Sequence, residues 1–141
     1  MIKGIIFDLD GTTLNTLYDI QDAINLTLKE FNYPSLTYDE VRNRVGRGSR
    51  NLVKDSIPEN IDDSKIDEIL KRYIEIYGYH YAIKTVPYDG IRELLKQLNN
   101  LNILISFNSN KPDEFTKNLI KKHYPEINVL SIYCWPSNYL P

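Results

Sequence analysis

The strongest constraint on this chain is a short apolar segment near its start that ends in two acidic residues. The segment 3–7 is β-branched or aromatic after its glycine and does not alternate with polar residues, which is typical of a strand buried on both faces of a parallel sheet. Asp8 and Asp10 follow at once, and Gly11 comes next. Because Asp-Gly is also a preferred pair in tight hairpin turns, a β-hairpin is the alternative interpretation.

The segment after the acidic turn distinguishes these two interpretations. Leu17, Ile20 and Ile24 begin an apolar stripe at helical spacing that continues to Phe31, whereas a hairpin requires a second strand. The sequence therefore favours a strand, an acidic turn and then a helix. Such a turn lies at the carboxyl end of a strand, where α/β proteins place their ligands.

The rest of the chain predicts a helical insert within an α/β core. Apolar periodicity predicts helices through the first half, and Thr37 with Glu40 has the spacing of a capping box. Near the end, 101–107 reads as a second apolar strand, 113–123 as a helix and 128–134 as a third strand. We therefore expect an α/β fold in which a helical insert, 16–83, interrupts a core formed by 1–15 and 84–141.

The polar residues at the two strand ends indicate phosphate chemistry. Two carboxylates facing one pocket repel each other, and a divalent metal is the usual compensation, with oxygen ligands favouring Mg²⁺. The hydroxyls of Thr12 and Ser109 are natural donors to a phosphate. Arg47, between two nearby glycines, is either a second anion contact or part of a solvated loop.

Composition excludes several classes of function. The net charge of −2 gives no reason to expect binding to nucleic acid or to an anionic membrane surface. Cys134 is the single cysteine, which excludes an intramolecular disulfide and a metal site built from cysteines. No apolar stretch has the length of a signal peptide or a membrane span. We therefore expect a cytoplasmic protein.

Two motifs carry a resemblance to a known family. Asp8-Leu9-Asp10-Gly11-Thr12 after an apolar strand resembles the first signature of the haloacid-dehalogenase-like phosphohydrolases. Ser109-Asn110-Lys111-Pro112 resembles their second signature, as written in the phosphoglycolate-phosphatase-like branch. The helical insert is similar to the cap of that branch, and 87–90 is similar to its return into the core. The resemblance implies an incomplete Rossmann-like parallel sheet with an inserted α-helical cap.

The resemblance also implies roles for individual residues. Asp8 would be the nucleophile that forms an aspartyl-phosphate, and Asp10 would be the acid and then the base. Mg²⁺ would be bound by Asp8 and by the backbone carbonyl of Asp10. The residues expected to bind substrate or phosphate are Gly11, Thr12, Ser109, Asn110, Lys111 and Arg47. The implied activity is Mg²⁺-dependent hydrolysis of a small phosphorylated metabolite; the alternatives are a phosphomutase of the same superfamily and a catalytically dead phosphate-binding remnant.

Two further elements of the family pattern are missing from the printed sequence. Members carry a later lysine that steadies the phosphate and a second acidic pair that completes the metal site. Here no lysine follows Lys122, and Glu126 is the only acidic residue after Glu114. We therefore expect a C-terminally truncated chain with impaired activity. We also expect marginal stability or self-association, because the first strand would have one unpaired edge.

Overall fold

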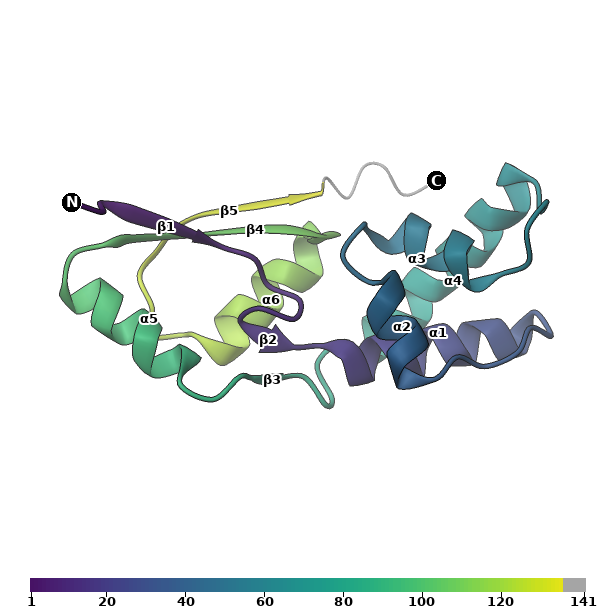
Figure 1. The fold of residues 1–141 in the computed structure, drawn as a ribbon, viewed down its shortest axis with the longest axis horizontal. Coiled ribbons are helices and arrows are strands. Elements are labelled where there is room, and N and C mark those ends of the chain that lie inside the picture. The colour runs from purple at the N-terminus through teal and green to yellow at the C-terminus, as the bar shows by residue number, and fades with distance from the viewer. Residues whose placement is uncertain (136–141) are drawn as a thin grey trace. The chain divides into compact units, whose positions relative to one another are not determined.

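The computed structural model describes residues 1–135 of the 141 residues. Residues 136–141, which the sequence assigns to the core segment 84–141, lie outside the described part. Contacts divide the described residues into a sheet unit, formed by Met1–Asn15 and by the chain from Val86 to Trp135, and a helical unit, Thr16–Thr85. Each unit is compact by itself, and Figure 1 labels its helices and strands.

The sheet unit contains the parallel sheet that the sequence predicts. Strands β1 (Gly4–Phe7), β4 (Leu104–Pro112) and β5 (Val129–Trp135) pair in the order β1-β4-β5, and both pairings are parallel. Helices α5 (Ile91–Asn100) and α6 (Asp113–His123) lie together against one face of the sheet (Figure 1). The α/β class with an incomplete parallel sheet is thus confirmed.

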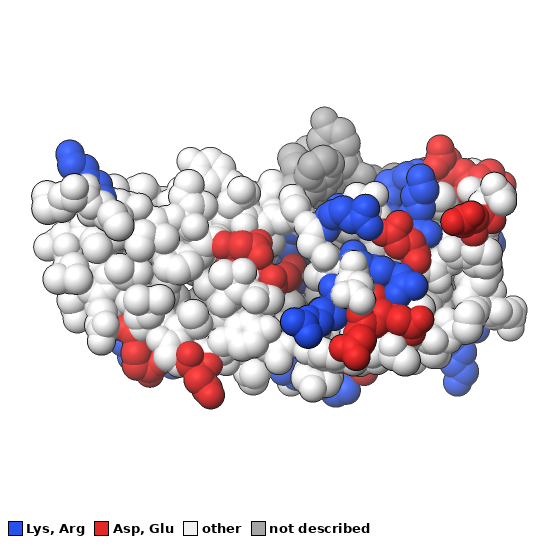
Figure 2. All heavy atoms as spheres, in the orientation of Figure 1, with Lys and Arg blue, Asp and Glu red and all other residues white. Residues whose placement is uncertain are grey.

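One face of the sheet is packed and the other is open. On the packed face Ile105 and Phe107 are fully buried, and the Phe107 ring stacks on Tyr124 with centroids 6.2 Å apart. On the other face Ile6, Leu104 and Tyr133 are 66%, 52% and 60% exposed. Figure 2 shows few charged side chains over β1. Within residues 1–135 β1 is an edge strand, as the sequence predicts.

The helical unit consists of α1 (Leu17–Glu30), α2 (Tyr38–Arg44), α3 (Ser49–Ser56) and α4 (Asp63–His80). The Thr37–Glu40 capping box at the start of α2 is present, as the spacing predicts. Asp19 of α1 is fully buried and accepts hydrogen bonds from the backbone N–H groups of Lys84 and Thr85. The end of the helical unit is therefore fastened to its beginning.

The structure corrects two details of the sequence prediction. The second strand begins at Leu104 and continues through Pro112, whereas the sequence placed a loop after Phe107. Polar side chains remain in the strand because β5 pairs with it, Ser109 lying opposite Cys134. The sequence also missed a short antiparallel pair between β2 (Leu14–Asn15) and β3 (Val86–Pro87). Two-residue strands carry no periodicity, so nothing in the pattern could reveal them.

Candidate active site

The acidic turn is built on the backbone carbonyl of Leu9. This oxygen accepts hydrogen bonds from the N–H groups of Thr13 and Leu14 at 3.1 and 3.0 Å, while the Leu9 side chain is fully buried. Gly11 has φ of +78°, a left-handed conformation that strains residues with a Cβ atom. Asp8 and Asp10 are thereby held on a tight turn at the carboxyl end of β1, and the turn does not form a hairpin.

Two contacts from outside the motif brace this turn. The buried Thr13 hydroxyl donates to the backbone carbonyl of Asp8 at 3.1 Å. The Tyr124 hydroxyl donates to the carbonyl of Thr13 at 2.7 Å, and burial raises the pKa of Tyr124 to about 12. Sequence reasoning missed Tyr124, because a contact that joins positions 111 residues apart leaves no local signal.

The surroundings of the Asp8 carboxylate shift its pKa in both directions. Its Oδ2 accepts a hydrogen bond from the Thr12 hydroxyl at 3.3 Å. Partial burial raises the pKa of Asp8 above its usual value, a hydrogen bond from the Leu9 N–H opposes this shift, and the charge of Asp10 adds to it. The two carboxylates of the motif therefore interact electrostatically, as the sequence predicts.

The neighbouring strand brings a hydroxyl and an ammonium group to the same end of the sheet. Lys111 Nζ lies 3.2 Å from Asp10 Oδ1, with the two side chains 4% and 16% exposed. The Lys111 N–H donates to Ser109 Oγ at 3.2 Å, and Ser109 is itself buried. Because that hydroxyl accepts this bond, its own proton is available for donation to an oxyanion.

The remaining predicted residues are placed less centrally. Asn110 is exposed on β4. Arg47 belongs to the helical unit, where its guanidinium forms an ion pair with Asp55. The arginine is thus already engaged by a carboxylate of its own unit.

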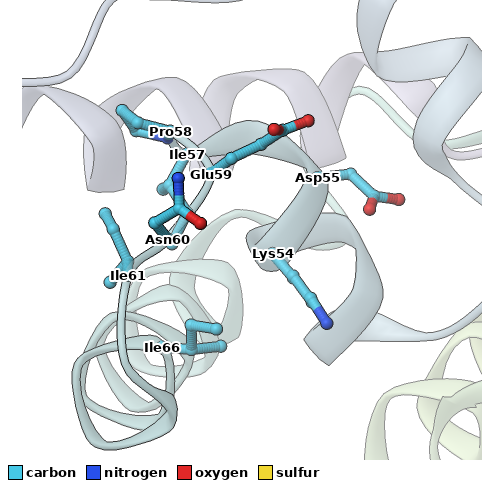
Figure 3. Close-up of a pocket in the computed structure, with 8 residues that line it drawn as sticks. All are labelled: Lys54, Asp55, Ile57, Pro58, Glu59, Asn60, Ile61 and Ile66. Atoms are coloured by element: carbon cyan, nitrogen blue, oxygen red, sulfur yellow. The ribbon is translucent and has the colours of Figure 1, made fainter.

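Two cavities among the described residues lie away from the acidic turn. One of about 370 Å³ is in the helical unit, between the end of α3 and the start of α4 (Figure 3). Its lining residues are Lys54, Asp55, Ile57, Pro58, Glu59, Asn60, Ile61 and Ile66. A second, of about 190 Å³, lies at the amino ends of β4 and β5, between residues such as Asn102 and Asn128. Neither is lined by a residue of the acidic turn.

The oxygen atoms of the acidic turn are of the kind that magnesium prefers as ligands. Among the described residues, no group of three or more His, Cys, Asp or Glu side chains is placed to hold a metal. Mg²⁺, however, is usually bound through only one or two carboxylates, with water and substrate phosphate as its other ligands. Asp8 and Asp10 supply these oxygens, and the buried Asp10 Oδ1 accepts no hydrogen bond from the described part of the chain.

Comparison with known proteins gives a consistent result. The family model for haloacid dehalogenase-like hydrolases matches residues 5–133. Over 122 residues the chain is 37% identical to a phosphoglycolate phosphatase from Pseudomonas syringae pv. tomato, covering 84% of this chain and 45% of that protein. A phosphoglycolate phosphatase from Nitrosospira multiformis is 32% identical over 124 residues, or 85% of this chain and 55% of the relative.

Solved structures show the same fold. A provisionally assigned phosphoglycolate phosphatase from Lactobacillus delbrueckii subsp. bulgaricus superposes with a TM-score of 0.86 at 26% identity, covering 94% of this chain and 64% of that one. The chain thus spans about half the length of the relatives it matches in sequence. None of the helices in residues 1–135 is long and apolar enough to cross a membrane. The family match over most of the chain, together with the acidic turn at the end of β1, shows that this protein belongs to the haloacid dehalogenase-like hydrolases.

Proposed function

We propose that the site serves the hydrolysis of a phosphomonoester, carried by a small metabolite such as phosphoglycolate, with Asp8 as the nucleophile. The observation that carries this proposal is that Asp8 and Asp10, which follow β1, and Ser109, on the neighbouring strand β4, lie at the same end of the parallel sheet. Phe7 pairs with Phe107 in register, so the residues that follow these positions on β1 and β4 leave the sheet side by side. A phosphoryl group there meets a nucleophile, an acid and a hydroxyl donor.

Asp8 and Asp10 supply the groups for both steps of the proposed reaction, the formation and the hydrolysis of the aspartyl-phosphate. A carboxylate oxygen of Asp8 attacks phosphorus, the bond to the ester oxygen breaks, and Asp10 as an acid gives its proton to the leaving oxygen. A water molecule then attacks the phosphorus of the acyl phosphate and gives a proton to the Asp10 carboxylate. The bond to Asp8 breaks, which releases inorganic phosphate and restores both side chains.

The other residues of the site hold the phosphoryl group. The Thr12 and Ser109 hydroxyls and the backbone at Gly11 donate to its oxygens, and Asn110 contacts the substrate at the edge. Mg²⁺ bound by the Asp8 carboxylate and the Asp10 carbonyl would neutralise charge on the phosphoryl oxygens. We further propose that the helical unit acts as the cap, with Arg47 as a contact for an anionic substrate, and that the protein is cytoplasmic.

The test measures phosphate release and the covalent intermediate together. The protein is incubated with Mg²⁺ and either 2-phosphoglycolate or p-nitrophenyl phosphate, and peptide mass spectrometry after acid quench locates any phosphoryl adduct. We expect phosphate release and an adduct on Asp8, both abolished by Asp8→Asn. Asp39→Asn, which removes an exposed carboxylate of the helical unit, is the matched control. Release that persists in Asp8→Asn would overturn the assignment of the nucleophile.

A further inference from the structure

Lys111 is a buried cation whose partner is an acid of the site. Its side chain is only 4% exposed, and its ammonium lies 3.2 Å from Asp10 Oδ1. Lysine is rarely buried to this degree unless it is paired, because removing the ammonium from water is costly. Lys111 lies in β4 where the register with β5 shifts, between the paired residues Ser109 and Pro112, and its ammonium reaches the acidic turn.

The ion pair between Lys111 and Asp10 lacks a hydrogen bond. The distance is that of a salt bridge, yet Asp10 Oδ1 is buried and accepts no hydrogen bond within the described residues. The ammonium is therefore close to the carboxylate oxygen but not aligned for a hydrogen bond with it. Such a pair has Coulomb attraction without the directional bond that normally offsets desolvation.

An anion that entered this site would need that ammonium. Asp8 and Asp10 carry like charges at the mouth of the turn, and both repel a phosphoryl dianion. The hydroxyls of Thr12 and Ser109 donate hydrogen bonds but bring no charge. Lys111 lies next to Ser109 on the same strand end, joined to it through the bond between its N–H and Ser109 Oγ.

We propose that Lys111 is an exchangeable counter-ion that pairs with Asp10 in the free protein and donates to a phosphoryl oxygen when substrate binds. The proposal rests on the proposed function, since it places a phosphoryl group at the same site, and it names the residue that makes the site accept a dianion. In the free protein Asp10 and the phosphate then compete for one ammonium group. This competition distinguishes an exchangeable lysine from one that only stabilises the turn.

The first test measures binding of inorganic phosphate without turnover. Phosphate is titrated by calorimetry at pH 7.5 with EDTA present, so that no divalent metal contributes. We expect Lys111→Met to weaken binding by about 10-fold or more, the usual loss for a hydrogen bond to a charged group, and Lys111→Arg to retain most of it. Lys121→Met, at an exposed position on α6, should bind as the unmodified protein does.

The second test uses the competing carboxylate. If Asp10 and phosphate share one ammonium group, Asp10→Asn should bind phosphate several-fold more tightly, and the double variant with Lys111→Met should lose this gain. Thermal unfolding of each variant shows whether it is folded, and Lys111→Arg keeps the charge if Lys111→Met does not fold. Weaker or unchanged binding in Asp10→Asn, or no phosphate binding by the unmodified protein, would overturn the proposal. Because no step requires turnover, the result is independent of whether Asp8 is a nucleophile.

Discussion

The hydroxyl of Tyr124 donates a hydrogen bond to the backbone carbonyl of Thr13 at 2.7 Å, which ties the end of α6 to the acidic turn. The same carbonyl also accepts from the Tyr88 N–H at 3.3 Å. Three separate parts of the chain thus meet at one oxygen atom of the turn. The position of Asp8 and Asp10 therefore depends on residues that follow the motif by a long stretch of sequence.

Tyr124→Phe should lower the free energy of unfolding by about 1 kcal/mol, the usual net value of one buried hydrogen bond. The loss is modest because the Thr13 carbonyl keeps its bond from Tyr88 and because the ring still stacks on Phe107. Urea unfolding measures it. Tyr79→Phe, at a side chain that is 84% exposed, should change stability little, and equal effects at both positions would contradict the inferred brace.

His123 should make the sheet unit sensitive to mild acid. Burial lowers the pKa of His123 below its usual value, the charges of Lys122 and Arg92 add to the shift, and its Nε2 has no partner within the described residues. The unfolded chain then binds a proton near pH 6.5 while the folded chain does not. The stabilising contribution is present above that pH and is lost as the pH falls toward the folded pKa, at up to about 1.4 kcal/mol per pH unit.

Urea unfolding at pH 7.5 and pH 5.5 tests this linkage. The loss of stability between the two pH values should be smaller in His123→Gln than in the unmodified protein. His80→Gln, in the helical unit, is the matched control. If all three proteins lost the same stability between pH 7.5 and pH 5.5, the pH dependence would have to come from groups other than His123.

Asp19→Asn should destabilise the helical unit by about 2–3 kcal/mol, the range for buried hydrogen bonds to a charged group. The carboxylate accepts from Lys84 N–H at 2.9 Å and from Thr85 N–H and Oγ1 at 2.8 and 2.7 Å. An amide would turn its own N–H toward one of these donors. Hydrogen exchange at Lys84 and Thr85 should accelerate, whereas Asp39→Asn should leave it unchanged.

We propose that the protein self-associates, with a second copy pairing along the outer edge of β1 and covering the open face of the sheet beside it. Ile6, Leu104 and Tyr133 expose much of their surface there, few charges lie over β1 to repel a second copy (Figure 2), and the outer edge of β1 has no strand beside it within residues 1–135. Sedimentation velocity should show a concentration-dependent dimer. Ile6→Lys should shift it toward monomer, because a charge on an edge strand opposes pairing.

The control for this prediction lies in the other unit. Leu26→Lys places the same charge at a position that is 42% exposed on α1 and should leave the sedimentation profile unchanged. A monomer at all concentrations, or equal effects of the two substitutions, would argue against association through the sheet.

Local patterns in the sequence predict much of the fold, because their causes lie within a few residues. The apolar run before Asp8 forms β1, and the stripe from Leu17 forms α1. The Thr37–Glu40 spacing forms the capping box at the start of α2. The two family motifs lie where the sequence predicts, on neighbouring strands of one parallel sheet. Each of these features follows from periodicity, capping or turn preference acting on adjacent residues.

Tertiary pairing decides how the site is assembled. Ser109 stays in a strand because β5 pairs with it, and Lys111 lies between the paired residues Ser109 and Pro112, although their polar sequence predicts a loop. The ion pair between Lys111 and Asp10 and the hydrogen bond from Tyr124 to Thr13 join residues far apart in the chain. The sequence by itself predicted which residues would carry the chemistry. Only the folded sheet decided which of them face one another, because burial and long-range pairing act between segments that no local pattern connects.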